Sequence, residues 1–254
     1  MPEIATPYAP GSLCGVYLAP QDQQATLDFY RDLLGWKGDP ADQVVCELNG
    51  KAVALVGSKE YVSKIGLMVP LGMWIPLFAC TDAWATLGLI QKAGGRQVGT
   101  VREVGKLGKM LVAVDHQGAH FGLWEPGEFA GAQVTHETGA VNWIELRATN
   151  MDAAMPFYQA VFGFQYASNG GGTYKIGVGD QEIGGLCPGD PGRPARWMTY
   201  FQVDDVDSSK DTLAQLGGAS GGHQYRVSNG SQSRGWVGCD TGRAEFVVNA
   251  PTKP

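Results

Sequence analysis

Apolar residues recur along the chain in short strand-like runs that alternate with helical stretches. Residues 16–19 alternate as a strand, and residues 21–34 carry apolar side chains at the spacing of one helix face. Gly35 marks the end of that helix, because glycine commonly stops one. Asn49-Gly50, between apolar runs at 44–48 and 52–56, predicts a hairpin turn. The first stretch of the chain should therefore fold as a strand, a helix and a hairpin.

The same order of elements returns along the rest of the chain. A strand at 74–80, a helix at 84–92 and strands at 110–114 and 120–124 complete the first half. The second half predicts strands at 141–148 and 197–203, helices at 152–162 and about 206–216, a hairpin around Gly179-Asp180, and final strands near 235–238 and 244–249. The repeating unit is βαβββ. The predicted fold class is α+β, built from four such modules.

Matching motifs separated by nearly half the chain length indicate an internal duplication. They are Phe29-Tyr30 and Phe157-Tyr158, Gly94-Gly95 and Gly217-Gly218, and Pro126 and Pro251. We therefore expect two domains, at residues 11–126 and 139–251, with a linker at 127–133.

Composition narrows the class of protein. The 254 residues include 19 basic and 25 acidic side chains, a net charge of −6, without a basic cluster. This balance argues against nucleic-acid binding, which needs a positive patch. There is no apolar run long enough for a membrane span, and residues 1–10 lack the features of a secretory signal, so we expect a cytoplasmic protein. The five cysteines include no Cys-x-x-Cys pair, which argues against a disulfide framework or a zinc cluster.

Three stretches of the chain resemble the vicinal oxygen chelate superfamily, which includes glyoxalase I, extradiol dioxygenases, and fosfomycin- and bleomycin-resistance proteins. They are residues 143–158 (Trp-Ile-Glu-Leu-Arg-Ala-Thr-Asn-Met-Asp-Ala-Ala-Met-Pro-Phe-Tyr), 200–207 (Tyr-Phe-Gln-Val-Asp-Asp-Val-Asp) and 115–126 (Asp-His-Gln-Gly-Ala-His-Phe-Gly-Leu-Trp-Glu-Pro). The last is similar to a four-module actinobacterial branch often labelled hydroxylase. The resemblance covers almost the whole chain. It implies two glyoxalase-like domains, each a cup-shaped sheet with helices outside and the ligand inside.

The resemblance also implies a divalent metal, held by His and Glu from the strands that open each module and from a last strand. In this chain those positions hold Gly15, Ile75 and Gly122 in the first half and Trp143, Met198 and Val247 in the second. Gly, Ile and Val offer no side-chain donor, and a thioether suits only soft metals. The four histidines lie outside the module-opening strands. We therefore expect no metal and no cofactor, and we disfavour metal-dependent thiol transfer, isomerisation and ring cleavage.

Because strand side chains alternate between faces, residues two positions from the family's metal positions should also face the cup. The expected lining is Tyr17, Leu77, His120 and Trp124 in the first cup, and Trp143, Glu145, Met198, Tyr200, Gln202, Glu245, Val247 and Asn249 in the second. The intervening residues, such as Ile144, Phe201 and Phe246, are apolar, as expected beneath a helix. A one-residue slip would reverse this pattern, which favours the register.

Three of these residues are catalytic candidates. Glu145 lies on an otherwise apolar strand, where desolvation disfavours the charged carboxylate and suits it to general acid–base catalysis. The structural alternative is an ion pair with Arg147 or Arg196. Glu245 is a candidate partner for Glu145, and His120 a candidate base or hydrogen-bonding group.

The remaining cup residues are candidate substrate contacts, with core packing as the alternative. They are Tyr17, Trp124, Trp143, Met198, Tyr200, Gln202, Val247 and Asn249.

Two functions remain open. The first is a metal-independent enzyme that isomerises, cyclises or eliminates from a small hydrophobic or aromatic metabolite, such as a natural-product intermediate. The alternative is a non-catalytic drug- or metabolite-binding protein of bleomycin-resistance type. In either case one cup can be a structural remnant. The expected partner is a small molecule, with no nucleic acid and no membrane, and the chain is expected to be a monomer or a homodimer.

Overall fold

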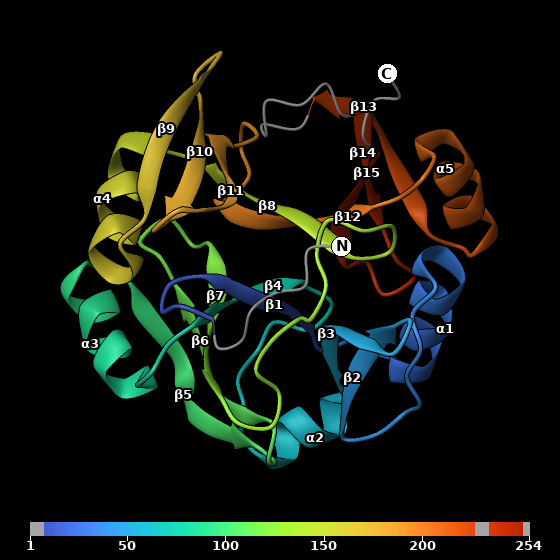
Figure 1. The fold of residues 1–254 in the computed structure, drawn as a ribbon, viewed down its shortest axis with the longest axis horizontal. Coiled ribbons are helices and arrows are strands. Elements are labelled where there is room, and N and C mark those ends of the chain that lie inside the picture. The colour runs from blue at the N-terminus through green and yellow to red at the C-terminus, as the bar shows by residue number, and fades with distance from the viewer. Residues whose placement is uncertain (1–7, 227–233, 251–254) are drawn as a thin grey trace.

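The computed structural model describes residues 8–226 and 234–250, which form two curled sheets with helices between and around them (Figure 1). Pro251, one member of the repeated motifs, lies outside the described residues. The first sheet runs in the order β2-β3-β1-β4-β7-β6-β5. Its strands are β1 (Leu13–Leu18), β2 (Gln43–Leu48), β3 (Lys51–Gly57), β4 (Ile75–Ala79), β5 (Arg96–Val104), β6 (Gly108–Val114) and β7 (His120–Pro126).

The second sheet runs in the order β13-β14-β15-β12-β8-β11-β10-β9. Its strands are β8 (Val141–Ala148), β9 (Gln165–Gly170), β10 (Thr173–Val178), β11 (Gln181–Pro188), β12 (Arg196–Gln202), β13 (Ala219–Arg226), β14 (Arg234–Cys239) and β15 (Glu245–Ala250). The helices are α1 (Gln23–Leu34), α2 (Lys59–Lys64), α3 (Ala83–Lys92), α4 (Met151–Phe162) and α5 (Val206–Gln215). No helix in the described part of the chain is long and apolar enough to cross a bilayer.

Both sheets are built by the same pairing rule. The two module-opening strands of a sheet pair antiparallel, β1 with β4 and β8 with β12. Each opening strand also pairs parallel with the last strand of its own module. This pairing confirms the predicted α+β fold with two glyoxalase-like units.

The first module departs from the predicted unit. Between α1 and β2 it has an isolated bridge of Lys37 to Glu47 in place of a strand. Gly38 and Pro40 follow this bridge, and proline cannot donate to a strand ladder. The module instead carries the extra helix α2 after β3.

Local sequence signals account for the helix ends. The side chains of Asp22, Asp82, Asn150 and Asp205 each accept a backbone hydrogen bond at the start of α1, α3, α4 and α5, which satisfies a donor that has no partner within the helix. Gly35 ends α1 in a left-handed conformation with φ 79°, as predicted.

Two pairs of helices, each with one helix from either half of the chain, lie between the two sheets. In Figure 1, α3 lies beside α4 on one side of the molecule and α1 beside α5 on the other. One apolar core joins the first module to the fourth, and includes Phe29, Trp74 and Phe246. A second core joins the two middle modules through residues such as Phe121 and Phe157, and also includes Trp197 of β12. Helices α1 and α3 of the first half are therefore buried against α5 and α4 of the second half.

The tyrosine of the first Phe-Tyr motif hydrogen-bonds across this junction. The Tyr30 hydroxyl in α1 accepts from Trp74 Nε1 at 2.7 Å and donates to Asp240 Oδ2 at 3.2 Å. Asp240 belongs to the turn before β15 and also accepts from the backbone N–H of Ala244. Burial and the neighbouring carboxylate raise the pKa of Tyr30, so its hydroxyl keeps its proton.

The second Phe-Tyr motif repeats the arrangement at the other junction. The Tyr158 hydroxyl in α4 accepts from Trp197 Nε1 at 3.0 Å and donates to Asp115 Oδ2 at 3.1 Å. Asp115 is in the turn before β7 and accepts from the backbone N–H of Ala119. The duplicated motif therefore joins the two halves at two equivalent points.

We expect Tyr158→Phe to lower the free energy of unfolding by about 1–3 kcal/mol, because it leaves the buried Trp197 N–H without its acceptor. Urea denaturation measures the change. Tyr174→Phe is the matched control, since Tyr174 packs against the same core and its hydroxyl has no hydrogen bond within the described residues. Equal stability of the two variants would contradict a structural role for the Tyr158 hydroxyl.

Candidate functional site

The structure gathers the apolar members of the expected cup lining into two buried clusters, one on each sheet. Tyr17, Leu77 and Trp124 share one buried cluster on the inner face of the first sheet. Trp143, Met198, Tyr200 and Val247 share another on the inner face of the second. The alternate residues, such as Ile144 and Phe246, pack in the helix-side cores. We call these inner faces the first cup and the second cup.

The first cup is filled by the protein itself. In Figure 1, α2 lies at the open side of the first sheet, between the sides formed by β5 and β2. Val62 of α2, Leu67 and Phe129 belong to the same buried cluster as Tyr17 and Trp124. Phe129 comes from the predicted linker, so this segment is part of the first cup.

Three contacts show how closely the first cup is packed. A Cβ on Gly122 would lie 2.5 Å from Leu77 Cδ2, so a larger residue there would require the leucine side chain to move. The indole N–H of Trp124 donates to the Phe129 carbonyl at 2.9 Å, and Tyr17 accepts from Gln43 Nε2 at 3.2 Å. Tyr17 and Trp124 thus face a packed interior, which leaves the second cup as the candidate site.

A buried polar group lies at the centre of the second cup. The Tyr200 hydroxyl donates to Glu145 Oε1 at 2.8 Å, and Arg147 Nε lies 3.5 Å from the same oxygen. The side chains of Glu145 and Arg147 are only 5% and 2% exposed. Strand β8 brings both charged residues to the same face, because they are two positions apart. Met198 of β12 is paired with Glu145 of β8, and its side chain belongs to the apolar cluster around the carboxylate.

Further ion pairs connect this centre to the rim of the cup. Arg147 Nη1 lies 3.6 Å from Asp190, and Asp190 also pairs closely with Arg196. The Arg196 guanidinium lowers the pKa of Asp190. Glu245 in turn accepts from Arg193 at 2.9 Å. Asp190 and Arg193 belong to the glycine- and proline-rich segment between β11 and β12, which these pairs attach to the sheet.

Burial controls the protonation of the groups around Glu145. Desolvation, followed by the nearby carboxylate, raises the pKa of Tyr200, so the phenol stays protonated and acts as a hydrogen-bond donor. The same two causes raise the pKa of Cys187 on β11. Its sulfur is therefore a thiol at neutral pH, which disfavours Cys187 as a nucleophile.

A cavity of about 370 Å³ lies over β13, β14 and the start of β15, and Glu145, Arg147 and Tyr200 are not among its lining residues. Val237 and Glu245 line it, and Val237 packs against the Trp143–Met198–Tyr200–Val247 cluster. The other lining residues are Arg193, Ala219, Ser220, Gly221, Gly238 and Cys239. This volume is at the small end of the range for ligand pockets.

Several buried polar atoms in and beside the second cup lack a protein partner. Trp143 Nε1 and Asn249 Oδ1 have no hydrogen bond within the described part of the chain. Gln202, half-buried, accepts from Asn142 Nδ2 at 3.5 Å. Unsatisfied buried groups of this kind are uncommon in proteins and commonly contact water or a ligand.

The three catalytic candidates do not converge. Glu145 occupies the centre of the second cup, Glu245 pairs with arginines at its rim, and His120 lies in β7 of the other sheet. Arg147, which sequence reasoning considered only as a structural partner, contacts Glu145 together with Tyr200. Alternation along β8 could have identified it, since residues 143, 145 and 147 share one face.

The residues at the family's metal positions do not fit a divalent metal. Trp143, Met198 and Val247 form an apolar cluster, without a set of oxygen or imidazole donors. In the first cup, Gly15, Ile75 and Gly122 offer no donor side chain. Among the described residues, no group of three or more His, Cys, Asp or Glu side chains is placed to hold a metal ion.

Comparisons with known proteins place the chain in a family. Residues 140–239 match the family described as the Glyoxalase/Bleomycin resistance protein/Dioxygenase superfamily. "Putative glyoxylase CFP32" of Mycobacterium tuberculosis is 33% identical over 223 residues, covering 83% of this chain and 84% of that protein. "Anthracycline biosynthesis protein DnrV" of Streptomyces peucetius is 32% identical over 234 residues, covering 84% and 85%. The chain therefore belongs to this superfamily.

Solved structures agree on the fold. The Mn(II)-bound glyoxalase of Novosphingobium aromaticivorans aligns with a TM-score of 0.64 at 14% identity, covering 95% of this chain and 82% of that one. BphC, a halotolerant catechol dioxygenase, aligns with a TM-score of 0.59 at 14% identity, covering 95% and 87%. At 14% identity this likeness shows a shared fold, and the chemistry has to be inferred from the residues of the site.

We expect His120 to make the folded state less stable at mildly acidic pH. Burial lowers its pKa below 6.5, so between the two values the unfolded chain binds more protons and the free energy of unfolding rises with pH. His120→Gln should reduce this dependence in urea denaturation at pH 5.5 and 7.5. Exposed His116→Gln is the control, and an unchanged pH dependence in His120→Gln would contradict the prediction.

Proposed function

We propose that the second cup binds a small hydrophobic or aromatic metabolite and moves a proton on it without a metal. The observation that supports this proposal is the buried Glu145 carboxylate, held by Tyr200 at 2.8 Å inside an apolar cluster. A buried carboxylate is costly unless it is paired or used. Glu145 is paired, and a cavity that a ligand could occupy lies on the same sheet, over β13, β14 and the start of β15.

The proposed step is proton abstraction next to a carbonyl group. A carboxylate oxygen of Glu145 takes the proton from carbon, and the electron pair moves onto the carbonyl oxygen. Tyr200 fixes the orientation of the carboxylate through its hydrogen bond, and the amide of Gln202 is the candidate donor for the carbonyl. Glu145 then returns the proton at another carbon, which completes an isomerisation. Alternatively, the electron pair expels a leaving group that takes up the proton, which completes an elimination.

The likeness to the Streptomyces protein supports a natural-product substrate. Its printed name assigns it to anthracycline biosynthesis, and the two chains align over most of their lengths. An apolar wall that includes Trp143 and Met198 suits a flat, multi-ring compound. We therefore propose an aromatic or polycyclic ketone as the substrate class.

The alternative is a protein that binds such a compound without converting it. One observation favours this function: the Glu145 carboxylate is already matched by Arg147 and Tyr200, as in a purely structural ion pair. Binding would then depend on burial of apolar surface and stacking. Turnover distinguishes the two proposals.

We expect the purified, untagged protein to carry no stoichiometric Zn, Ni, Mn or Fe, because the family's metal positions hold Trp143, Met198 and Val247. Native mass spectrometry combined with elemental analysis tests this. A stoichiometric divalent metal would contradict the proposal and favour a glyoxalase or dioxygenase reaction. A co-purified organic compound would identify the ligand class directly.

We expect Glu145→Gln to slow proton exchange on a bicyclic ketone by roughly 10²–10⁴-fold, the usual contribution of a general base. The substrate probe is 2-tetralone in D₂O, and mass spectrometry follows deuterium uptake next to its carbonyl. Glu47→Gln, an exposed glutamate on β2, is the matched control. Tyr200→Phe keeps the ion pair with Arg147 and should give an intermediate rate.

Circular dichroism and urea denaturation establish that each variant is folded. Exchange by folded Glu145→Gln at the wild-type rate would contradict the acid–base role. If the wild-type protein binds 2-tetralone but does not accelerate exchange, the result favours the binding protein over the enzyme.

A further inference from the structure

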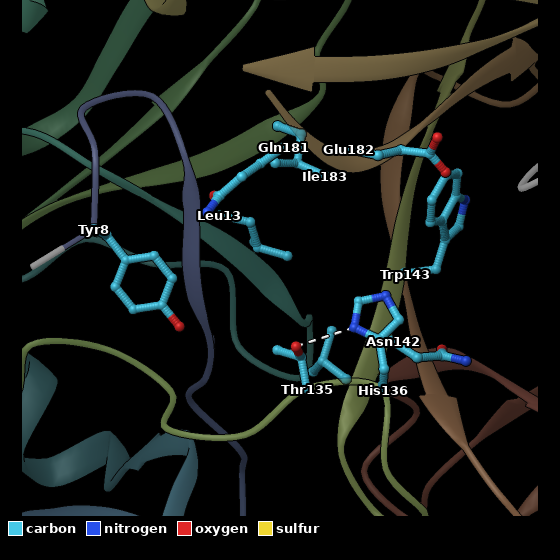
Figure 2. A pocket seen from close by; sticks show the side chains of 10 residues that line it. Tyr8, Leu13, Thr135, His136, Asn142, Trp143, Gln181, Glu182 and Ile183 are labelled. Atoms are coloured by element: carbon cyan, nitrogen blue, oxygen red, sulfur yellow. Dashed lines mark hydrogen bonds between the residues drawn. The ribbon is translucent and has the colours of Figure 1, made fainter. Parts of the chain in front are cut away.

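A separate pocket of about 290 Å³ lies where the two halves of the chain meet (Figure 2). The residues that line the pocket belong to the N-terminal segment, β1, the segment before β8, β8 and β11. The lining residues are Tyr8, Leu13, Thr135, His136, Val141, Asn142, Trp143, Gln181, Glu182 and Ile183. The pocket is therefore complete only in the full chain, and it does not include Glu145.

The backbone holds His136 in an unusual conformation at this pocket. Its φ of 60° lies in the left-handed region, which is uncommon for residues other than glycine and can mark a functional position. The His136 backbone N–H donates to the Val141 carbonyl at 3.2 Å. In Figure 2 the imidazole points toward the space that Leu13 and Trp143 border. Sequence reasoning did not select this histidine.

The imidazole of His136 can both donate and accept a hydrogen bond in the pocket. Its Nδ1 lies 3.0 Å from Thr135 Oγ1, and a threonine hydroxyl can act as donor or acceptor. Partial burial lowers the pKa of His136, so the ring is mainly neutral at pH 7. Depending on the tautomer, Nε2 presents either an N–H or a lone pair to a ligand.

The rest of the pocket is mainly apolar. Leu13, Val141 and Ile183 supply aliphatic surface, and Trp143 supplies a ring. The Tyr8 hydroxyl donates to the Ala132 carbonyl at 2.5 Å, which holds its ring in place. These walls favour a flat apolar molecule over a strongly hydrated one.

Among the described residues, the lining of this pocket offers no positive charge that would bind an anionic ligand. Glu182 is the charged residue among those that line the pocket. Its carboxylate pairs with Lys175 Nζ at 2.8 Å, so the pair is close to neutral. An added carboxylate or phosphate would have no cationic lining residue to bind.

We propose that this pocket is a second small-molecule site, which takes an uncharged hydroxylated aromatic compound of one or two rings. The hydroxyl binds to His136, and the rings lie between Leu13, Ile183 and Trp143. A hydroxyl group suits either tautomer of the histidine, because it donates and accepts. Trp143 lines this pocket and also belongs to the apolar cluster of the second cup.

Isothermal titration calorimetry with 2-naphthol as the probe tests this proposal. Wild-type protein should bind one equivalent, and 2-naphthoate, its anionic analogue, should bind at least tenfold more weakly. His136→Asn should weaken 2-naphthol binding at least fivefold. Asparagine tolerates the left-handed backbone but is too short to replace the ring. Exposed His116→Asn is the matched control and should bind as wild type.

Two cavity-filling variants locate the probe. Ile183→Trp fills the proposed pocket and should abolish binding, whereas Val237→Trp fills the cavity beside the second cup and should leave binding unchanged. Binding that is lost in Val237→Trp but kept in His136→Asn would overturn the proposal, as would the absence of saturable 2-naphthol binding by the wild type. Neither result bears on proton exchange at Glu145, so the two proposals can fail separately.

Discussion

The tryptophan–tyrosine–aspartate hydrogen bonds, made twice, are the interaction on which the architecture depends. Each tyrosine leaves its helix in one half and reaches a turn aspartate in the other half. A phenol that both accepts and donates can satisfy two buried partners at once, which removes the cost of leaving either unpaired. Because Tyr30 and Tyr158 occupy equivalent positions in the duplicated sequence, the same contact forms at both junctions and sets the two sheets back to back.

This arrangement leaves the inner faces of both sheets available, and the protein uses them differently. In the first cup, the extra helix α2 and the segment around Phe129 supply apolar side chains that fill the space. In the second, β8 places Glu145 and Arg147 on the inner face, with Tyr200 opposite. Duplication thus produced one cup that stabilises the fold and one that retains a buried polar centre, with a cavity farther along the same sheet, over β13–β15.

A buried ion pair is a weak source of stability, because desolvating two charges offsets most of their attraction. Glu145 and Arg147 are surrounded by an apolar cluster, yet the charges continue through Asp190 to the rim of the cup. Such a network fixes the carboxylate and the segment between β11 and β12 in one arrangement. Between the two halves, His136 adopts a left-handed backbone conformation, which costs more energy for a residue with a side chain than the usual helical or extended conformation.

The sequence alone determined the duplication, the α+β class, the helix ends and the register, because period-2 alternation and capping residues act locally. Alternation along β8 and β12 put Glu145, Tyr200 and Met198 on one face, and in the structure Tyr200 contacts Glu145. Whether a cup is open depends on segments distant in sequence, so only the tertiary structure showed that Phe129 and Val62 fill the first. The pairing of Glu245 with Arg193 and the pocket at His136 also required it, because each is decided by contacts between residues that no local pattern connects.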